Sequence, residues 1–444
     1  MDCDVLIVGS GLAGLNAANE LKEKYPALRV KICDAGGCAS TEIMGFCAPV
    51  APGDSPDCFK ADIIKSGDGL NSIELAQVLA ERALPEMKRL EKMGLEFDHE
   101  PDGSYSVIHS IGSTFPRVVH AGTVTGKLAM KLLDFPVEKL RIRQLVKGKN
   151  GSIAGVVAEN GEIIRAKAVI IASGGFAGLW QFSTWSKKLR GDMLISALEA
   201  GVELCNLGCV QFEPAVTVYP TAAKGFPVIT TLLHEGAKLY DAAGNDLVAD
   251  KVPPKRELAE RIQKSIDDGN AFEHGGVRYD LSGVDEESFA RKYPEYLKKY
   301  LQWFPNLKSA IFEVRPAAHT TLGGICVKAD CSTAVPGLFA AGEAVGNLHG
   351  RDRLGGNAGL EVFVFGRIAG DSAGKFASGK ADFEEFAETP SGRSGITADI
   401  LDRYFTVLPD ENKLKAGLKE LESMPQNSET KFLKQIFSDK LKTL

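Results

Sequence analysis

Apolar and polar positions in the first 34 residues follow a pattern that predicts strand, helix and strand. Val5 to Val8 form a continuous apolar run, which indicates a buried strand from Cys3 to Val8. Leu15 to Leu21 has helical periodicity, and a second apolar strand runs from Arg29 to Cys33. A strand, a helix and a second strand in this order predict the start of a parallel sheet in an α/β protein.

The rest of the chain predicts a sheet domain in two blocks, with a second domain inserted between them. Residues from Gly201 to Glu313 are more polar and rich in proline, as expected of an inserted domain. The expected domains are residues 1–205 and 316–385 for the sheet, 206–315 for the insertion, and 386–444 for a C-terminal helical region. The expected elements are helices at Ile73–Leu95, Thr123–Leu133, Lys255–Ile266, Glu287–Tyr300 and Leu360–Lys375, a hairpin within Phe97–His120, strands within Leu140–Ile170, Ala168–Ala172 and Leu338–Ala341, and helices after Gly392.

Three glycines after the first strand have the G-x-G-x-x-G spacing of a dinucleotide-binding turn. Gly9 permits the tight turn, Gly11 lets a pyrophosphate approach the backbone, and Gly14 lets the helix pack on the strand. Asp34 ends the second strand, where a carboxylate can bind ribose hydroxyls. We expect cofactor contacts here from Gly9, Gly11, Leu12, Ala13, Gly14, Asp34, Ala35 and Gly36.

A second nucleotide-binding block near residue 340 favours FAD over NAD. Gly342 and Glu343 follow an apolar strand, and Asn357 opens a glycine-flanked helix whose N-terminus can stabilise the negative charge of a reduced flavin. The remaining cofactor contacts that we expect are Ser40, Thr41, Gly45, Val146, Ser173, Gly174, Gly342, Glu343, Asn357, Ala358 and Leu360.

Composition narrows the class of protein. The net charge of −6 argues against nucleic acid as a partner. No apolar run reaches the roughly 18 residues that a membrane span needs, and the first strand begins too early for a signal peptide. We therefore expect a cytoplasmic protein. Nine cysteines without a C-x-x-C pair predict free thiols and no metal site. Cys33 and Cys38 have a C-x4-C spacing, but buried cysteine is favoured over a redox pair.

Two segments carry a resemblance to a known family. Gly337 to Gly370 resembles the flavin-binding signature of the fumarate reductase and succinate dehydrogenase flavoprotein family, which includes L-aspartate oxidase. Pro316 to Ile325 resembles a second segment of that family. The resemblance implies a Rossmann-like FAD-binding domain, an inserted α+β capping domain and a short C-terminal helical region. It also implies hydride transfer between flavin N5 and a carbon beside a carboxylate.

The resemblance also assigns site residues, with departures from the family pattern. His319 and Arg353 match the histidine and arginine that grip a substrate carboxylate. Glu213 replaces a histidine that holds a second carboxylate. In the stretch that starts at Thr230, His234 stands at or near an arginine expected to move the proton, and Thr230 is a further catalytic candidate. No histidine matches the family's covalent flavin attachment between Thr41 and Gly45, so we expect noncovalent FAD.

The departures favour reduction of a C=C bond in an enoate other than fumarate, with His234 as the first candidate acid. An amine or amino-acid oxidase of the aspartate oxidase type is the first alternative, since Glu213 could face a substrate ammonium. The second alternative is the flavoprotein subunit of an electron-transfer complex. The expected partners are a small carboxylate substrate and a separate electron-transfer protein or subunit, because the chain has no haem or iron–sulfur signature.

Overall fold

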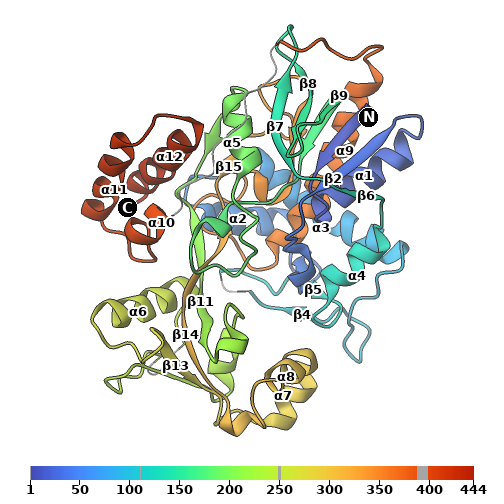
Figure 1. Cartoon of the computed structure of the whole chain (residues 1–444). Coiled ribbons are helices and arrows are strands. Elements are labelled where there is room, and N and C mark those ends of the chain that lie inside the picture. The colour runs from blue at the N-terminus through green and yellow to red at the C-terminus, as the bar shows by residue number, and fades with distance from the viewer. Residues whose placement is uncertain (1, 111, 249–251, 388–398) are drawn as a thin grey trace.

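The computed structural model describes residues 2–110, 112–248, 252–387 and 399–444, and it confirms the expected α/β class (Figure 1). Within those residues the central sheet has the order β6-β2-β1-β9-β8-β7, with β16 paired to β9. β6, β2, β1, β9 and β16 run parallel, so a strand from late in the sequence completes the N-terminal sheet. The strands are β1 Cys3–Val8, β2 Val30–Asp34, β6 Val137–Lys139, β7 Ile142–Lys147, β8 Ile153–Ala158, β9 Ile163–Ile171 and β16 Leu338–Ala340.

Two helices of the sheet domain that are far apart in the sequence pack closely on each other. They are α1 (Leu12–Lys24) and α9 (Asn357–Ser378). A Cβ added at Gly366 would lie 2.6 Å from Ala13 O, and one at Gly370 would lie 2.6 Å from Ala17 O. These glycines therefore let the two backbones touch. The other helices of this domain are α2 Pro56–Gly67, α3 Ile73–Lys92, α4 Thr125–Leu132 and α5 Asp192–Glu199, and a small sheet contains β3 Gly45–Cys47, β4 Val107–Ile108 and β5 Val118–His120.

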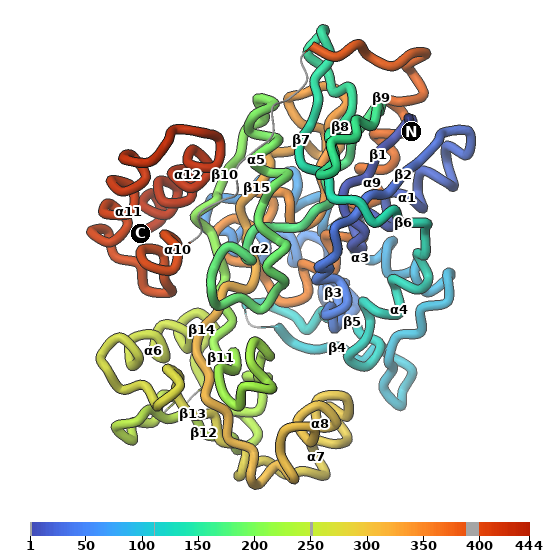
Figure 2. Tube along the Cα trace, in the orientation of Figure 1, coloured from blue at the N-terminus to red at the C-terminus, as the bar shows by residue number. Residues whose placement is uncertain are grey.

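The inserted capping domain has its own sheet and its own apolar core. Its strand order is β11-β14-β13-β12, and the long strands β11 and β14 run side by side out of the FAD-binding domain (Figure 2). The bounds are β11 Val210–Tyr219, β12 Lys238–Tyr240, β13 Val277–Asp280, β14 Ile311–Thr321 and α6 Lys255–Asp267. β14 continues across the boundary expected after residue 315, and we keep the four-part division of the chain as a proposal.

The single helix expected from Glu287 to Tyr300 is two helices in the structure. α7 covers Glu286–Lys292 and α8 covers Pro294–Tyr300. Tyr293 between them has φ −136° and ψ 56°, outside the helical region. The residue before a proline is disfavoured in helical conformation, and proline itself suits the first turn of a helix. Pro294 therefore ends one helix and starts the next.

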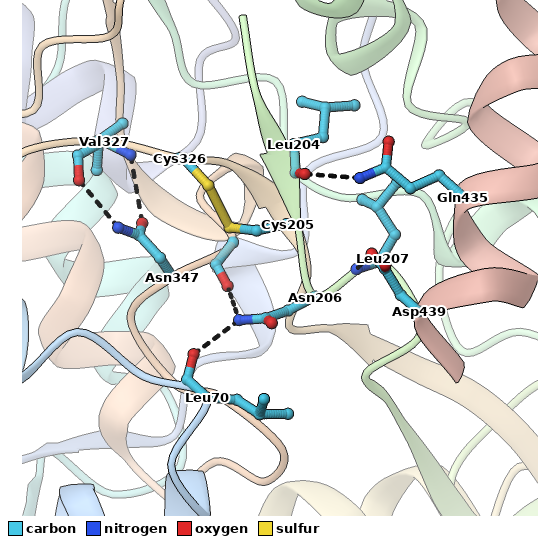
Figure 3. The surroundings of a disulfide bond; sticks show 11 residues. Leu70, Leu204, Cys205, Asn206, Leu207, Cys326, Val327, Asn347, Gln435 and Asp439 are labelled. Carbon is cyan, nitrogen blue, oxygen red and sulfur yellow. Dashed lines mark hydrogen bonds between the residues drawn. A yellow bond between two sulfur atoms is a disulfide. The ribbon is translucent and has the colours of Figure 1, made fainter. Parts of the chain in front are cut away.

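A disulfide joins Cys205, shortly before β11, to Cys326, shortly after β14, the two long strands that lead into and out of the capping domain (Figure 3). The antiparallel strands β10 (Leu204–Cys205) and β15 (Gly324–Ile325) bring these distant cysteines to a Cα–Cα distance of 6.1 Å. Asn206 beside them donates from Nδ2 to Leu70 O and Gly346 O, both at 2.9 Å. The expectation of free thiols is therefore wrong for this pair, because pairing depends on a strand contact that spacing does not reveal.

Three C-terminal helices pack against the FAD-binding domain. They are α10 Asp399–Tyr404, α11 Glu411–Ser423 and α12 Ser428–Lys442. Gln435 donates to Leu204 O at 2.6 Å, and Trp180 donates from Nε1 to Phe405 O at 3.0 Å. Part of the expected helical region, residues 388–398 with Gly392, lies outside the described residues. In the described ranges, no helix is both long and apolar enough to cross a membrane.

Candidate active site

The parallel strands of the central sheet end at one edge, and the residues after them meet there. Gly9 follows β1, Asp34 closes β2, Ser173 lies just beyond β9, and Glu343 lies beyond β16. All four line one cavity of about 1280 Å³. Ligands of open α/β sheets bind at the carboxyl ends of the strands. Pockets for one small ligand usually measure about 300–1,000 Å³, so this cavity is large enough for a long cofactor together with a substrate.

Close backbone contacts require glycine at two positions of the first turn. Gly9 has φ +111°, and a Cβ there would lie 2.2 Å from Ala172 O. A Cβ on Gly14 would lie 2.0 Å from Gly9 O. Side chains cannot fit at either position. Gly14 therefore serves helix packing, as its place in the sequence pattern predicts; it lies outside the cavity wall, and the cofactor contact expected from it stays a prediction.

Asp34 and Ser40 face the start of α1. The Asp34 carboxylate accepts hydrogen bonds from Ser10 Oγ, from Ser10 N at 3.3 Å and from Gly36 N at 2.8 Å. Ser40 Oγ accepts from Leu12 N at 2.9 Å, at a helix start without a cap from its own turn. A fixed carboxylate next to free helix N–H groups fits the ribose and pyrophosphate of a dinucleotide.

Glu343 and the start of α9 line the cavity beyond the end of β16. Burial raises the pKa of Glu343 to about 7, although its carboxyl group accepts hydrogen bonds from Thr321 N at 3.0 Å and Thr321 Oγ1 at 3.2 Å. Asn357 Oδ1 is buried and has no hydrogen-bond partner in the part of the chain that the structure describes. Ala358 and Gly359 line the cavity beside it. Asn357 itself lies outside the cavity wall, so the features that fit FAD here are the helix N-terminus and the Glu343 carboxyl group, because the ribityl chain and ring of FAD offer donors and acceptors.

His319 and Arg353 line the same cavity, together with Glu213 and Lys255. The His319 ring stacks on Trp185 at 5.3 Å between centroids, and a hydrogen bond of 2.8 Å joins its Nδ1 to Thr184 Oγ1. Burial lowers the pKa of His319 to about 4, so the ring is neutral at neutral pH. Arg353 donates to Leu354 O at 3.1 Å, while its Nε is buried and has no partner among the described residues. Arg353 therefore offers an unused N–H donor for an anion, and His319 adds a second from Nε2 in the tautomer whose Nδ1 accepts from Thr184 Oγ1.

Glu213 is paired with a lysine that the sequence did not single out. Lys255 Nζ, at the first residue of α6, lies 2.8 Å and 3.1 Å from the two Glu213 oxygens. Burial opposes ionisation of Glu213, but Lys255, with His319 and Arg353, offsets it and holds the pKa below its ordinary value. Glu213 is 7 % exposed, whereas the Lys255 side chain is 55 % exposed. Where the sequence predicted an unpaired negative charge at Glu213, the structure has an ion pair. Its Lys255 ammonium group is open to water.

His234 does not reach the cavity. It lies in the 3₁₀ helix Thr230–Glu235 with an exposed side chain, and it is absent from the cavity wall, which Thr230 does line. Thr230 and Thr231 at the start of this helix line the cavity, whereas His234 near its end is exposed to solvent. The expectation that His234 stands opposite the flavin finds no support in this arrangement.

The structure brings together most of the residues that the sequence selects. The residues that line the cavity are Gly9, Gly11, Ala13, Asp34, Ala35, Gly36, Ser40, Thr41, Gly45, Ser173, Gly174, Glu213, Thr230, His319, Gly342, Glu343, Arg353 and Ala358. The residues outside its wall are buried, apart from His234, and they are Leu12, Gly14, Val146, Asn357 and Leu360.

Sequence reasoning missed the residues that the capping domain contributes. Lys255, Phe226, Tyr296 and Trp303 all line the cavity. Lys255 follows two prolines and opens a helix, where a lysine gives no signal of its own. The three aromatic residues have the ordinary appearance of core positions. Only the folding of the insertion over the strand ends reveals them.

A dinucleotide sheet with a capping domain over its strand ends defines a class of flavin-dependent oxidoreductases. The chain belongs to the FAD_binding_2 family, described as an FAD binding domain, which matches residues 4–358. It is thus an FAD-dependent oxidoreductase of the group that includes fumarate reductases and L-aspartate oxidases.

Relatives of known name agree with this assignment. A fumarate reductase (CoM/CoB) subunit from Methanothermobacter marburgensis is 33% identical over 85% of this chain and 73% of its own length. L-aspartate oxidase from Mesorhizobium japonicum is 32% identical over 83% of this chain and 75% of its own length. The solved structure of Mycobacterium smegmatis Sdh1 with UQ1 has a TM-score of 0.83 at 26% identity, covering 99% of this chain and 85% of that one.

Proposed function

We propose that this enzyme reduces the C=C bond of an enoate, a carboxylate conjugated to a double bond, and that fumarate is not its natural substrate. The observation that carries the proposal is the arrangement around His319. One carboxylate grip, His319 with Arg353, has an unpaired donor at Arg353 Nε among the described residues, whereas the Glu213–Lys255 ion pair stands where a second grip is expected. A dicarboxylate would have to place its second charge beside Glu213.

The chain's own residues then have distinct tasks. Arg353 binds the carboxylate through its guanidinium, which suits a planar anion, and neutral His319 adds a hydrogen bond. Thr184 fixes the orientation of the His319 ring. FAD, when bound, supplies the hydride that one alkene carbon receives. We propose that the flavin is held noncovalently, because no histidine is present near Thr41, where the family's covalent attachment is expected.

Lys255 replaces His234 as our candidate for the acid. Its ammonium group donates a proton to the second alkene carbon, and the amine regains a proton from water, to which the side chain is open. Glu213 orients the ammonium through its two hydrogen bonds. Hydride and proton together convert the double bond to a single bond, which balances the reaction.

The test is to reduce the flavin of the purified protein under anaerobic conditions and to mix it with single enoates. Rapid return of the oxidised flavin absorbance with a monocarboxylic enoate supports the proposal. A clear preference for fumarate contradicts the substrate assignment. Hydrogen peroxide formed under air with amines or amino acids, without any response to enoates, would instead establish an oxidase.

A pair of variants tests the proton donor. Lys255→Met combined with Glu213→Gln removes the acid without leaving a buried carboxylate unpaired. It should slow enoate reduction by about 100-fold or more. Arg256→Met is the matched control, because Arg256 is the next residue of α6, is 68 % exposed and pairs with Glu260 outside the cavity wall. Equal losses in both variants would exclude Lys255 as the acid.

Two other functions keep some support. The relatives named L-aspartate oxidase favour an amino-acid oxidase, but Glu213 already holds the Lys255 ammonium where a substrate ammonium would bind. A relative named as one subunit of a fumarate reductase favours a flavoprotein that receives electrons from a separate protein. This role is compatible with enoate reduction, and co-purification with an iron–sulfur protein would support it.

A further inference from the structure

The substrate side of the cavity continues from the ionic residues onto an aromatic wall of the capping domain. Phe226, Tyr296 and Trp303 line the cavity, and each is partly buried. Their rings pack on one another, with 5.1 Å between the centroids of Phe226 and Trp303 and 6.0 Å between those of Phe226 and Tyr296. We call these three residues the aromatic wall.

The aromatic wall lies beside the proposed reaction site rather than at a remote surface. Tyr296 Oη lies 3.9 Å from Met44 Sδ, in the segment of the FAD-binding domain next to Gly45. Burial raises the pKa of Tyr296 to about 12, and the nearby charges of Glu42 and Glu213 add to this shift. Tyr296, Glu213, His319 and Arg353 all line the same cavity. One molecule could contact the carboxylate grip and the wall at once.

Charges next to the wall do not provide a second anion site. Lys224 and Lys299 line this part of the cavity, but so do Glu42 and Glu295. Lys299 Nζ lies 5.3 Å from the Phe226 ring centroid, so its charge is directed to an aromatic face. Balanced charges around apolar rings favour a neutral, apolar group over a second carboxylate.

From this arrangement we propose that the natural substrate is an enoate with an aryl group at the end away from the carboxylate. Arg353 and His319 hold the carboxylate, and the aryl ring packs against Phe226, Tyr296 and Trp303. This proposal rests on the proposed function for the reaction, but the binding of the aryl group can be measured without any reaction.

The binding experiment uses the FAD-loaded protein and two unreactive saturated acids. Calorimetric titration with 3-phenylpropanoate and with butanoate compares an aryl tail with a methyl tail on the same carboxylate. Burial of the ring should make 3-phenylpropanoate bind on the order of 10- to 100-fold more tightly. Equal affinities would overturn the proposal, and so would binding that does not require Arg353, as measured with Arg353→Met.

Variants of the aromatic wall test whether the aryl ring binds there. Phe226→Ala should reduce the ratio of the two affinities by about tenfold while leaving butanoate affinity unchanged. Trp303→Leu is a second, milder variant in case Phe226→Ala destabilises the capping domain, and thermal unfolding checks both. Val137→Ala, at an exposed strand position outside the cavity, is the control. An unchanged ratio in both wall variants would show that the ring binds elsewhere.

Reaction with reduced protein separates this proposal from the proposed function. Cinnamate and crotonate differ only in the group beyond the double bond. Faster flavin reoxidation by cinnamate supports both proposals. Equal or faster reoxidation by crotonate contradicts only the proposal that the substrate has an aryl group. If neither acid reoxidises the flavin but 3-phenylpropanoate still binds preferentially, enoate reduction fails while the aromatic subsite stands.

Discussion

The cofactor wall and the substrate wall of the cavity are built in different ways. On the cofactor side, glycines let the main chain approach the cavity, as at Gly9 and Gly359, and few long side chains are needed. On the substrate side, the surface consists of side chains from distant segments, such as Lys255 of the insertion and Arg353 after β16. The first wall therefore depends on the path of the main chain, whereas exchange of a few side chains would change what the second wall accepts.

The largest expected effect comes from disturbing, at Gly14, the helix packing that supports the cofactor wall. Gly14→Val would force carbon atoms into Gly9 O, which lies 2.0 Å from the position of a Cβ. Overpacking at such a site should cost about 3 kcal/mol of unfolding free energy and abolish flavin binding. Flavin content per chain and thermal unfolding measure both effects. Gly379→Ala is the control, since its Cβ would meet nothing closer than 3.6 Å; similar losses there would contradict the steric explanation.

The next effect concerns the substrate wall. Arg353→Lys keeps the charge but removes the fork that binds a carboxylate, and kcat/KM for an enoate should fall by about 10- to 100-fold. Flavin content should stay unchanged, because the two walls are separate in function. Arg351→Lys tests the same loop outside the cavity, where Arg351 pairs with Asp68 at 3.2 Å. The idea fails if the two variants lose activity equally.

A smaller effect depends on pH and on Glu343. The ordinary pKa of this carboxyl group is 4.5, and burial raises it to about 7 in the folded protein. The folded state then binds more protons than the unfolded state between these values, so the free energy of unfolding falls as pH rises through this range. Glu343→Gln removes this dependence.

We therefore expect cofactor-free wild-type protein to lose up to about 3 kcal/mol of stability relative to Glu343→Gln between about pH 5 and about pH 8. Chemical denaturation at the two pH values measures the difference. The same variant should bind FAD more weakly, since the carboxyl group is a candidate partner of the ribityl chain. A parallel pH dependence in wild type and variant would show that other groups cause it.

The smallest effect is expected at His234, which lies on neither wall. Its side chain is exposed and outside the cavity. His234→Ala should change kcat and KM by less than about twofold, as at most surface positions. A large loss of kcat in steady-state kinetics would return His234 to the reaction and require the capping domain to adopt another position during turnover.

The sequence by itself determined the cofactor side of this protein. The strand, the three glycines and Asp34 lie within 34 consecutive residues, and the contact of Gly14 with Gly9 is local, whereas that of Gly9 with Ala172 forms through the pairing of β1 with β9. Their meaning follows from short-range geometry. The resemblance in residues 337–370 supplied the second block, and the pairing of β16 with β9 joins both blocks in one sheet.

Only the tertiary structure decided the substrate side. Glu213 and Lys255 are separated by 42 positions and pair because α6 packs near β11, while Cys205 and Cys326 meet through β10 and β15. His234 matched a family position but faces solvent, since the orientation of a side chain depends on the local helix geometry. Interactions between distant segments leave no periodic or spacing signal in the chain, and therefore the proposed proton donor and the aromatic wall emerged only with the fold.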